Sequence, residues 1–233
     1  MLILHSLGGC LGVKDASPYV LKIHTYLRMA GIEHKTESGL KSFKKSPRKL
    51  FPFIEDNGNI ITDSYFIMQY LKSHYVDLDM HLSEVQKAES FLYQEVIDNL
   101  LYECLLASRW RGENWPKIKQ AFFDNLPAPS FVRNMLAGKA QKKVLNRLRF
   151  NVDNYTQNEH LQLADEAFKS LSVMLGDNDY MFNNQPSSFD ATCFGMLAQF
   201  ILFELKSLYS KKAENYDNLV QYCHRINKQF FLV

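Results

Sequence analysis

Residues 51–64, FPFIEDNGNIITDS, decide the fold of the first part of this chain. Residues 53–55 and 59–62 form two short apolar runs on either side of an Asn-Gly pair, and this pattern is the strongest short-range sign of a β-hairpin. Asp63 and Ser64 follow the second run and precede apolar residues at helical spacing, which predicts the start of a helix. The stretch is therefore predicted to form two antiparallel strands followed by a helix.

Upstream of this stretch, short strands and helices are predicted to alternate. Residues 2–4 are a compact apolar run, which is typical of a buried strand. Ser17 is a preferred N-cap, and the proline after it is tolerated in a first helical turn, so a helix is expected from there to Gly31. Residues 33–37 suit a second strand, and the basic residues 41–49 suit a short helix or an ordered loop. The predicted order is therefore βαβ, helix, ββα.

Beyond residue 80 the sequence changes to long stretches of helical period with few glycines. Three helix starts are marked by a Ser or Thr with Gln, Glu or Asp three residues later: Ser83 with Gln86, Thr156 with Glu159, and Ser187 with Asp190. Three prolines predict shorter helices with a kink or loop between residues 110 and 130: Pro116, Pro127 and Pro129. The sequence therefore predicts an α/β domain over residues 1–76 and an all-helical domain over residues 83–233.

The composition is that of an ordinary globular chain. Of its 233 residues 46% are hydrophobic, and 27 basic side chains nearly balance 25 acidic ones, which leaves a formal charge of +2. This balance gives no overall electrostatic reason to expect nucleic acid as a partner. A small or neutral partner is expected instead.

Cysteine and histidine usage indicates a reducing compartment and no metal. The four cysteines have no CxxC spacing and are expected to be reduced thiols: Cys10, Cys104, Cys193 and Cys223. The histidines show no paired ligand spacing, so no metal site is expected. The first residues lack the basic start of a signal peptide, and the longest apolar stretch, residues 194–203, is about half as long as a membrane-spanning helix. These features predict a cytoplasmic protein that does not span a membrane.

Several motifs, in order along nearly the whole chain, carry a family resemblance. They are SPYVLKIHTYLRMAG at 17–31, FPFIED at 51–56, DS at 63–64, RW at 109–110 with NWP at 114–116, and YMF at 180–182 with PSSFDA at 186–191. This set resembles the glutathione transferase superfamily, in particular the branch of metaxin-like and failed-axon-connections-like proteins and their bacterial relatives. The resemblance implies a thioredoxin-like α/β N-terminal domain that binds glutathione, and an all-α C-terminal domain that holds a second substrate.

The resemblance also implies roles for five residues. The hydroxyl of Ser17 would assist the glutathione thiolate, where the simpler interpretation is an N-cap alone. Phe51 and a cis Pro52 would present backbone groups to the peptide, where the alternative is an ordinary trans proline at a strand start. Asp63 and Ser64 would bind the γ-glutamyl ammonium and carboxylate, a role that is compatible with capping the helix.

Other residues have competing interpretations. The aromatic and basic residues Tyr102, Arg109, Trp110 and Trp115 either line the second-substrate pocket or belong to the core. Cys10 lies in the loop before the first helix, close to the expected site, although an incidental thiol is the commoner case. Ser187 and Asp190 are interpreted as structural, because they cap a helix expected to run through the core.

One departure from the family pattern concerns the glutathione loop. The family often has a Gly-Lys pair there, and this chain has Lys49 and Leu50. A lysine that would contact the glycyl carboxylate is thereby displaced and a permissive glycine is lost. This departure weakens the glutathione assignment.

Two clusters of basic residues lie at 41–49 and 139–149. A charge run is usually a solvated helix face, and this interpretation is favoured over attraction to an anionic membrane surface.

The leading hypothesis is a dimeric enzyme that conjugates glutathione, as co-substrate, to a small-molecule electrophile. The alternative is a non-catalytic scaffold with the same fold, of metaxin-like type. A glutathione-dependent reductase is disfavoured, because Ser17 stands where thiol-transferring relatives have the cysteine that forms a mixed disulfide.

Overall fold

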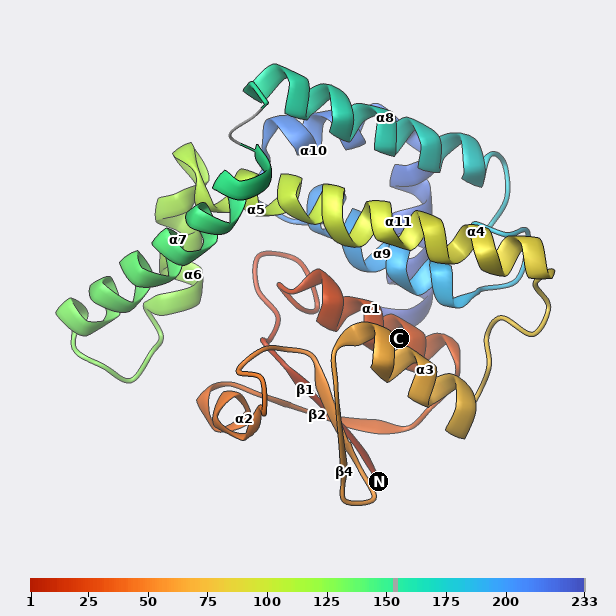
Figure 1. The fold of residues 1–233 in the computed structure, drawn as a ribbon, viewed down its shortest axis with the longest axis horizontal. Helices are drawn as coiled ribbons and strands as arrows, with labels where there is room; N and C mark the ends of the chain where they lie inside the picture. Colours follow the sequence, from red (N-terminus) through yellow and green to blue (C-terminus); the bar gives the residue numbers. More distant parts are fainter. Residues whose placement is uncertain (153–154, 233) are drawn as a thin grey trace.

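A four-stranded sheet with three helices forms the first part of the molecule, and the other helices form the rest (Figure 1). The computed structural model describes residues 1–152 and 155–232. The strands are β1 (Leu2–Ser6), β2 (His34–Ser38), β3 (Phe53–Asp56) and β4 (Asn59–Thr62). The helices among them are α1 (Pro18–Met29), α2 (Leu40–Lys45) and α3 (Ser64–His74). The order along the chain is the predicted βαβ, helix, ββα.

The sheet has the order β2-β1-β3-β4, with β1 parallel to β2 and antiparallel to β3. The predicted hairpin is confirmed: β3 and β4 pair from Asp56 with Asn59 to Phe53 with Thr62. Asn57 and Gly58 have φ values of 49° and 85°. Positive φ at both central residues is what a tight two-residue hairpin turn requires, and Asn-Gly adopts it at low cost.

The second part consists of helices of very different length. They are α4 (Glu84–Glu95), the π-helical segment η1 (Val96–Leu101), α5 (Tyr102–Trp110), the 3-10 turn η2 (Gly112–Asn114), α6 (Trp115–Phe123), α7 (Ser130–Val152), α8 (Gln157–Leu175), α9 (Ser188–Ile201), α10 (Leu208–Ala213) and α11 (Asp217–Phe231). All three predicted capping boxes are present, at the starts of α4, α8 and α9. The prolines act as predicted, since Pro116 lies in the first turn of α6 and the other two lie in the loop before α7.

Helix α9 is the centre of the helical part, and every residue from Phe189 to Ile201 is buried. Its capping carboxylate, Asp190, is fully buried and accepts hydrogen bonds from the Met181 and Ser187 N–H groups and from the Tyr222 hydroxyl. Burial raises the pKa of this carboxyl group, and these donors oppose the shift. The structural role expected for this residue agrees with these contacts.

Helix α1 lies between the sheet and α9 and packs closely against both. At Gly195 of α9, a Cβ atom would lie 2.8 Å from the carbonyl oxygen of Pro18 and 2.9 Å from the backbone nitrogen of Lys22. Both obstacles are backbone atoms that cannot move aside. Glycine is therefore required for this approach, which fixes the start of α1 against the helical part.

No helix among the described residues is both long enough and apolar enough to cross a membrane.

Candidate functional site

The strand register brings the five predicted site residues to one end of the sheet. His5, next to the last residue of β1, pairs with Phe53, and Phe53 pairs on its other side with Thr62. The Phe51–Pro52 segment therefore enters the sheet where β1 and β4 leave it. The peptide bond before Pro52 is cis, as predicted.

The buried carboxylate of Asp15 ties the start of α1 back to the end of β1. Its two oxygens accept hydrogen bonds from the Gly8 N–H at 2.9 Å and the Ser17 N–H at 2.8 Å. The Asp15 side chain also interacts with the Ser6 hydroxyl. Burial raises the pKa of Asp15 to about 7, and these donors limit the shift. Because of these bonds, Ser17 lies at the same end of the sheet as Pro52.

Ser17 is the N-cap of α1, as predicted. Its hydroxyl oxygen accepts a long 3.4 Å hydrogen bond from the Val20 N–H, and its side chain is half-buried. The hydroxyl proton is not used by this bond and is available to a ligand. Capping and assistance to a thiolate are therefore chemically compatible in this residue.

Arg109 reaches from α5 in the helical part to the loop before α1. Its guanidinium donates to the Ala16 carbonyl oxygen at 2.7 Å and to the Gln199 side-chain oxygen at 2.6 Å, and it lies over the Phe203 ring at 3.9 Å. Gln199 in turn donates to the Asp15 carbonyl oxygen at 3.0 Å. Burial lowers the pKa of Arg109 to about 10, which leaves it charged at neutral pH. The helical part thus fixes the backbone directly before Ser17.

The π-helical segment supplies a second contact with α1. Asp98 accepts from the Tyr19 hydroxyl through its carbonyl oxygen and from the fully buried Lys22 ammonium through its carboxylate, both at 2.7 Å. Burial raises the pKa of Asp98, and the Lys22 charge opposes this shift. The ring of Tyr102 lies 4.7 Å from that of Tyr19. Of the four residues considered for the second-substrate pocket, Tyr102 is the one with a ring contact in the first turn of α1.

Trp110 and Trp115 pack mainly on other aromatic rings. Their own rings stack at 5.2 Å, and Phe122 and Phe123 pack edge-on against them. Trp110 belongs to the core, and Trp115 packs against it.

The start of α3 is built differently from the start of α1. Asp63 has a φ of 76°, a left-handed conformation that is uncommon for a residue other than glycine, and its carboxylate accepts from the Tyr65 N–H at 2.9 Å. The Ser64 side chain is buried, yet its hydroxyl makes no hydrogen bond to any residue that the structure describes. Backbone strain of this kind is concentrated at binding sites in proteins. The start of α3 therefore combines strain with a polar group that is available to an anion.

Phe51 is held by ring contacts before the chain enters β3. Its ring stacks with that of Phe53 at 6.0 Å, and Phe53 stacks in turn on the buried His5 ring at 4.0 Å. Phe43 of α2 packs edge-on against Phe51 at 5.9 Å. These contacts fix the backbone at residue 51.

In the loop before Phe51, the residue at the position of the family glycine adopts a positive φ although it is a lysine. Lys49 has a φ of 53°, and its ammonium donates to the Lys44 carbonyl oxygen at 2.9 Å. The Ser46 hydroxyl holds the next residue, Leu50, by two backbone hydrogen bonds. The side chain of Leu50, in the place of the family lysine, is 64% exposed. No cation therefore occupies that position.

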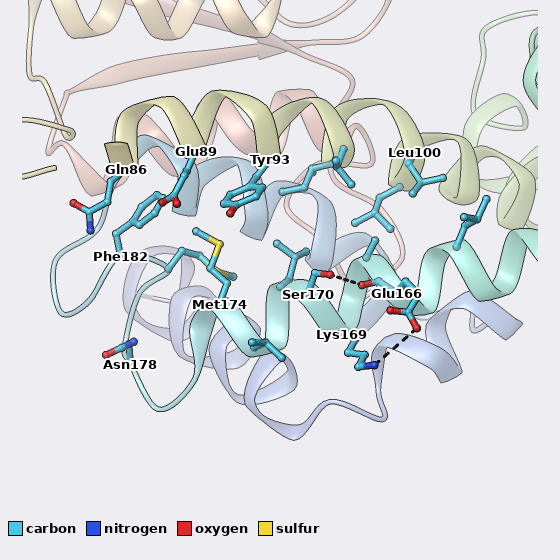
Figure 2. Close-up of a pocket in the computed structure, with 18 of the residues that line it drawn as sticks. Gln86, Glu89, Tyr93, Leu100, Glu166, Lys169, Ser170, Met174, Asn178 and Phe182 are labelled. Atoms are coloured by element: carbon cyan, nitrogen blue, oxygen red, sulfur yellow. Dashed lines mark hydrogen bonds and ion pairs between the residues drawn. The ribbon is translucent and has the colours of Figure 1, made fainter. Parts of the chain in front are cut away.

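The largest of three cavities in the described part of the chain lies elsewhere, between α4, η1 and α8. It has a volume of about 900 Å³ and is mainly apolar, as Figure 2 shows for Tyr93, Leu100, Met174 and Phe182. The η1 segment separates it from α1, because other residues of that segment line the cavity while Asp98 contacts α1. Sequence reasoning gave no indication of this cavity.

Two further cavities lie beside histidine side chains. One, of about 680 Å³, lies beside His160 and Tyr209, whose side chains are hydrogen-bonded at 2.8 Å, and the other, of about 450 Å³, lies beside Arg28 and His34. None of the three cavities is lined by any of the five predicted site residues.

The cysteines are thiols in this structure. Burial raises the pKa of Cys10 to about 11, so its thiolate is scarce at neutral pH, and the other three cysteines are fully buried. Within the described residues, no group of three or more His, Cys, Asp or Glu side chains is arranged to hold a metal ion.

Three residues that position this site were missed by sequence reasoning: Asp15, Lys22 and Asp98. Asp15 lies two residues before an N-cap, but a short Asp-x-Ser spacing alone does not reveal burial. Lys22 and Asp98 are 76 positions apart in the sequence, and nothing local indicates that they pair.

Comparison with known proteins gives matches over most of the chain. Residues 18–116 match the family model described as the glutathione S-transferase N-terminal domain, and residues 164–226 match the glutathione S-transferase C-terminal domain. Among solved structures, a glutathione S-transferase of Ceriporiopsis subvermispora in complex with glutathione has a TM-score of 0.66 at 16% identity, covering 98% of this chain and 97% of that one. A beta-etherase of Sphingobium sp. strain SYK-6 has a TM-score of 0.64 at 17% identity, covering 97% and 94%. These structures establish the shared fold.

The relatives include metaxins, failed axon connections and a glutathione S-transferase. Metaxin-2 of Mus musculus is 30% identical over 214 residues, covering 91% of this chain and 81% of the relative. The isoprene-epoxide glutathione S-transferase of Rhodococcus sp. strain AD45 is 27% identical over 234 residues, covering 94% of each chain. Failed axon connections of Drosophila melanogaster is 25% identical over 217 residues, covering 85% of this chain and 51% of the relative. The chain belongs to the glutathione S-transferase superfamily, in the branch of metaxin-like and failed-axon-connections-like proteins and their bacterial relatives.

Proposed function

We propose that this protein is a glutathione S-transferase that conjugates the glutathione thiolate to a small electrophile. One observation carries the proposal. The starts of α1 and α3 and the Phe51–Pro52 segment converge on one end of the sheet, and the α3 start has the unpartnered Ser64 hydroxyl. A helix N-terminus with a free hydroxyl suits a carboxylate, and the γ-glutamyl end of glutathione carries one.

In this arrangement glutathione lies along the end of the sheet. Ser64 donates to the γ-glutamyl carboxylate, and the exposed Asp63 carboxylate faces the ammonium group. The backbone of Phe51 pairs with the peptide as an added strand. The thiol then lies at Ser17, whose hydroxyl proton and helix N-terminus favour the thiolate.

The electrophile is proposed to approach beside the first turn of α1. Tyr19 and Tyr102 form an aromatic wall there, and Asp98 fixes Tyr19 through its hydroxyl. Attack of the thiolate sulfur on the electrophilic carbon forms the new C–S bond, and the leaving group or opened ring takes the electron pair. Holding both reactants in this orientation is the main catalytic contribution expected of such a site.

The first experiment is a calorimetric titration of glutathione into wild-type protein and Ser64→Ala at neutral pH. Binding in the micromolar-to-millimolar range that falls about tenfold or more in the variant supports the proposal, since a hydrogen bond to a charged group contributes about 1.5–3 kcal/mol. Because Ser64 has no protein partner, the variant should fold with an unchanged melting temperature. Absence of binding in wild type would contradict the proposal.

A second candidate function is a non-catalytic scaffold. Two observations favour it: Lys49 is engaged with the Lys44 carbonyl oxygen, and the three cavities described above lie away from Ser17. A scaffold needs no glutathione affinity, so the same titration separates the two functions.

A homodimer is proposed through the face formed by α3, α4 and α8. Large apolar side chains are exposed there next to the 900 Å³ cavity: Phe66, Val85, Phe91, Leu92, Val96 and Val173. Exposed apolar surface marks interaction sites where such side chains gather. The Leu92→Glu and Phe91→Glu double variant is expected to be a monomer in sedimentation velocity. An unchanged association state would contradict this surface.

The proposed setting is the cytoplasm, where the four free cysteines stay reduced.

A further inference from the structure

Charge is distributed very unevenly in this nearly neutral chain. Residues 115–152, which include α6 and α7, contain eight Lys and Arg side chains and a single acidic residue, Asp124. The rest of the chain contains 19 basic and 24 acidic side chains. The two helices therefore form a strongly basic region attached to an acidic body.

The outward face of α7, defined here by its exposed side chains, carries both basic and apolar residues. In its first two turns Phe131, Met135 and Leu136 are 72%, 49% and 40% exposed. The following turns expose three basic residues, Lys139, Lys142 and Lys143, whereas the Arg147 guanidinium lies over the Tyr102 ring at 5.2 Å. None of these three lysines has an ion-pair partner in the part of the chain that the structure describes, and the side chains of 149–152 lie outside that part.

The region also projects from the molecule. Figure 1 shows α6 and α7 extending to one side, away from the sheet and from α8 and α9. None of the three cavities is lined by residues of either helix. The outward face is thus a protruding surface outside these three cavities, and it is separate from the α3, α4 and α8 face.

We propose that the outward face of α7 docks this protein on anionic membrane surfaces. Lysine and arginine side chains are attracted to the negative surface potential of anionic lipids, and a neighbouring aromatic and aliphatic cluster enters the boundary between headgroups and acyl chains. Phe131 and Met135 supply that cluster at the exposed start of the helix. The sequence pattern alone favours a solvated helix face. The exposure of these apolar residues beside lysines without an ion-pair partner favours a membrane-binding face instead.

A membrane explains this face better than the alternatives. Single-stranded nucleic acid can use cations and an aromatic ring such as Phe131, but it gains no stacking from the exposed aliphatic side chains Met135 and Leu136. A peptide helix is typically bound in an apolar groove, and this helix lines none of the three cavities described above. A bilayer surface is broad and planar, and a projecting helix can reach it.

The test is sedimentation of the full chain with phosphatidylcholine vesicles, with and without about 30% phosphatidylserine, at physiological salt. Wild type is expected to sediment with the anionic vesicles and to stay in solution with the neutral ones. The triple variant Lys139→Gln, Lys142→Gln, Lys143→Gln is expected to bind about 100-fold more weakly, since each surface cation contributes roughly a factor of five. The double variant Phe131→Ser, Met135→Ser is expected to lose the binding that remains at high salt.

The matched control removes three cations from the other basic cluster: Lys41→Gln, Lys44→Gln, Arg48→Gln. These residues are also exposed, so both triple variants should fold equally well. Vesicle binding that survives in the control supports a specific α7 face. An equal loss of vesicle binding in both triple variants would show that binding depends only on net charge, and it would overturn the proposal.

Two further outcomes would also overturn it. The first is no sedimentation of wild type with anionic vesicles. The second is tighter binding to a labelled single-stranded oligonucleotide than to the vesicles, lost in the α7 triple variant. The latter would assign the face to nucleic acid instead.

Discussion

The starts of α1 and α3 lie at the same end of the sheet but differ in how their polar groups are used. At α1, Asp15 holds the Ser17 N–H, the Ser17 hydroxyl caps the helix, and Arg109 holds the preceding carbonyl group. At α3, the Ser64 hydroxyl has no partner among the described residues, and Asp63 keeps a left-handed conformation. The first helix start is held in place by the protein itself, and the second has hydrogen-bonding capacity left for a ligand. From this contrast we infer that the start of α1 positions the reacting thiol, and that the start of α3 contributes to ligand affinity.

The largest effect is expected from disturbing the placement of α1. Gly195→Ala puts a methyl group against the backbone of α1 and should lower the free energy of unfolding by about 3 kcal/mol. The matched control is Gly138→Ala in α7, where a Cβ atom meets nothing within 4 Å. That change should raise stability by about 0.5–1 kcal/mol, because alanine favours helix. Denaturant unfolding of both variants tests the pair, and equal effects would disprove the tight α1–α9 approach.

A crossed comparison of the two serines sharpens the contrast directly. Ser17→Ala should lower stability by about 1 kcal/mol through the lost cap and reduce turnover, with little change in glutathione affinity. Ser64→Ala should do the reverse, with stability within about 0.5 kcal/mol of wild type and affinity about tenfold lower. Thermal unfolding and calorimetry provide the two readouts. The same pattern in both variants would mean that the two helix starts have the same role.

A smaller gain is expected from restoring the family loop. In the double variant Lys49→Gly, Leu50→Lys, glycine adopts the positive φ at no cost and the new lysine reaches the glycyl carboxylate. Glutathione affinity should rise about fivefold, the value of a partly exposed ion pair of roughly 1 kcal/mol. The control Leu50→Met keeps the side chain long and neutral and should leave the affinity unchanged. A gain in both variants would exclude the charge as its cause.

The smallest effect on function is expected at Cys10. Its pKa of about 11 lies above that of a free cysteine, so burial disfavours the thiolate and the thiol is the main form at neutral pH. Alkylation by iodoacetamide should be about 100-fold slower than for free cysteine at pH 7 and should accelerate as the pH rises toward 11. Cys10→Ala should retain full turnover. Loss of turnover in that variant would revive the reductase alternative.

Features fixed by adjacent residues were predictable from the sequence. The Asn57-Gly58 turn and the Ser83, Thr156 and Ser187 capping boxes were predicted correctly because each depends on contacts within a few residues. The family resemblance added the cis bond before Pro52. The roles of the site residues stay predictions until ligand binding is measured.

Features that depend on distant residues were not predictable. The π-helical turn at η1 shifts the helix register so that Asp98 meets Lys22, and a single sequence has no marker for such a shift. Arg109 was considered for a substrate pocket, because a basic residue beside a tryptophan does not reveal that its guanidinium is buried against Ala16. The apolar surface of α4 likewise depends on how α8 packs beside it.

The contact from Arg109 to the Ala16 carbonyl oxygen also limits protein engineering. A chimera that joins the first 80 residues of this chain to the helical half of another relative inherits the loop before Ser17 but not the arginine that holds it. Grafting a new substrate specificity by exchanging halves would therefore disturb the thiol site as well. Arg109 and Gln199 should be transplanted together with the α/β half, as one compatible set.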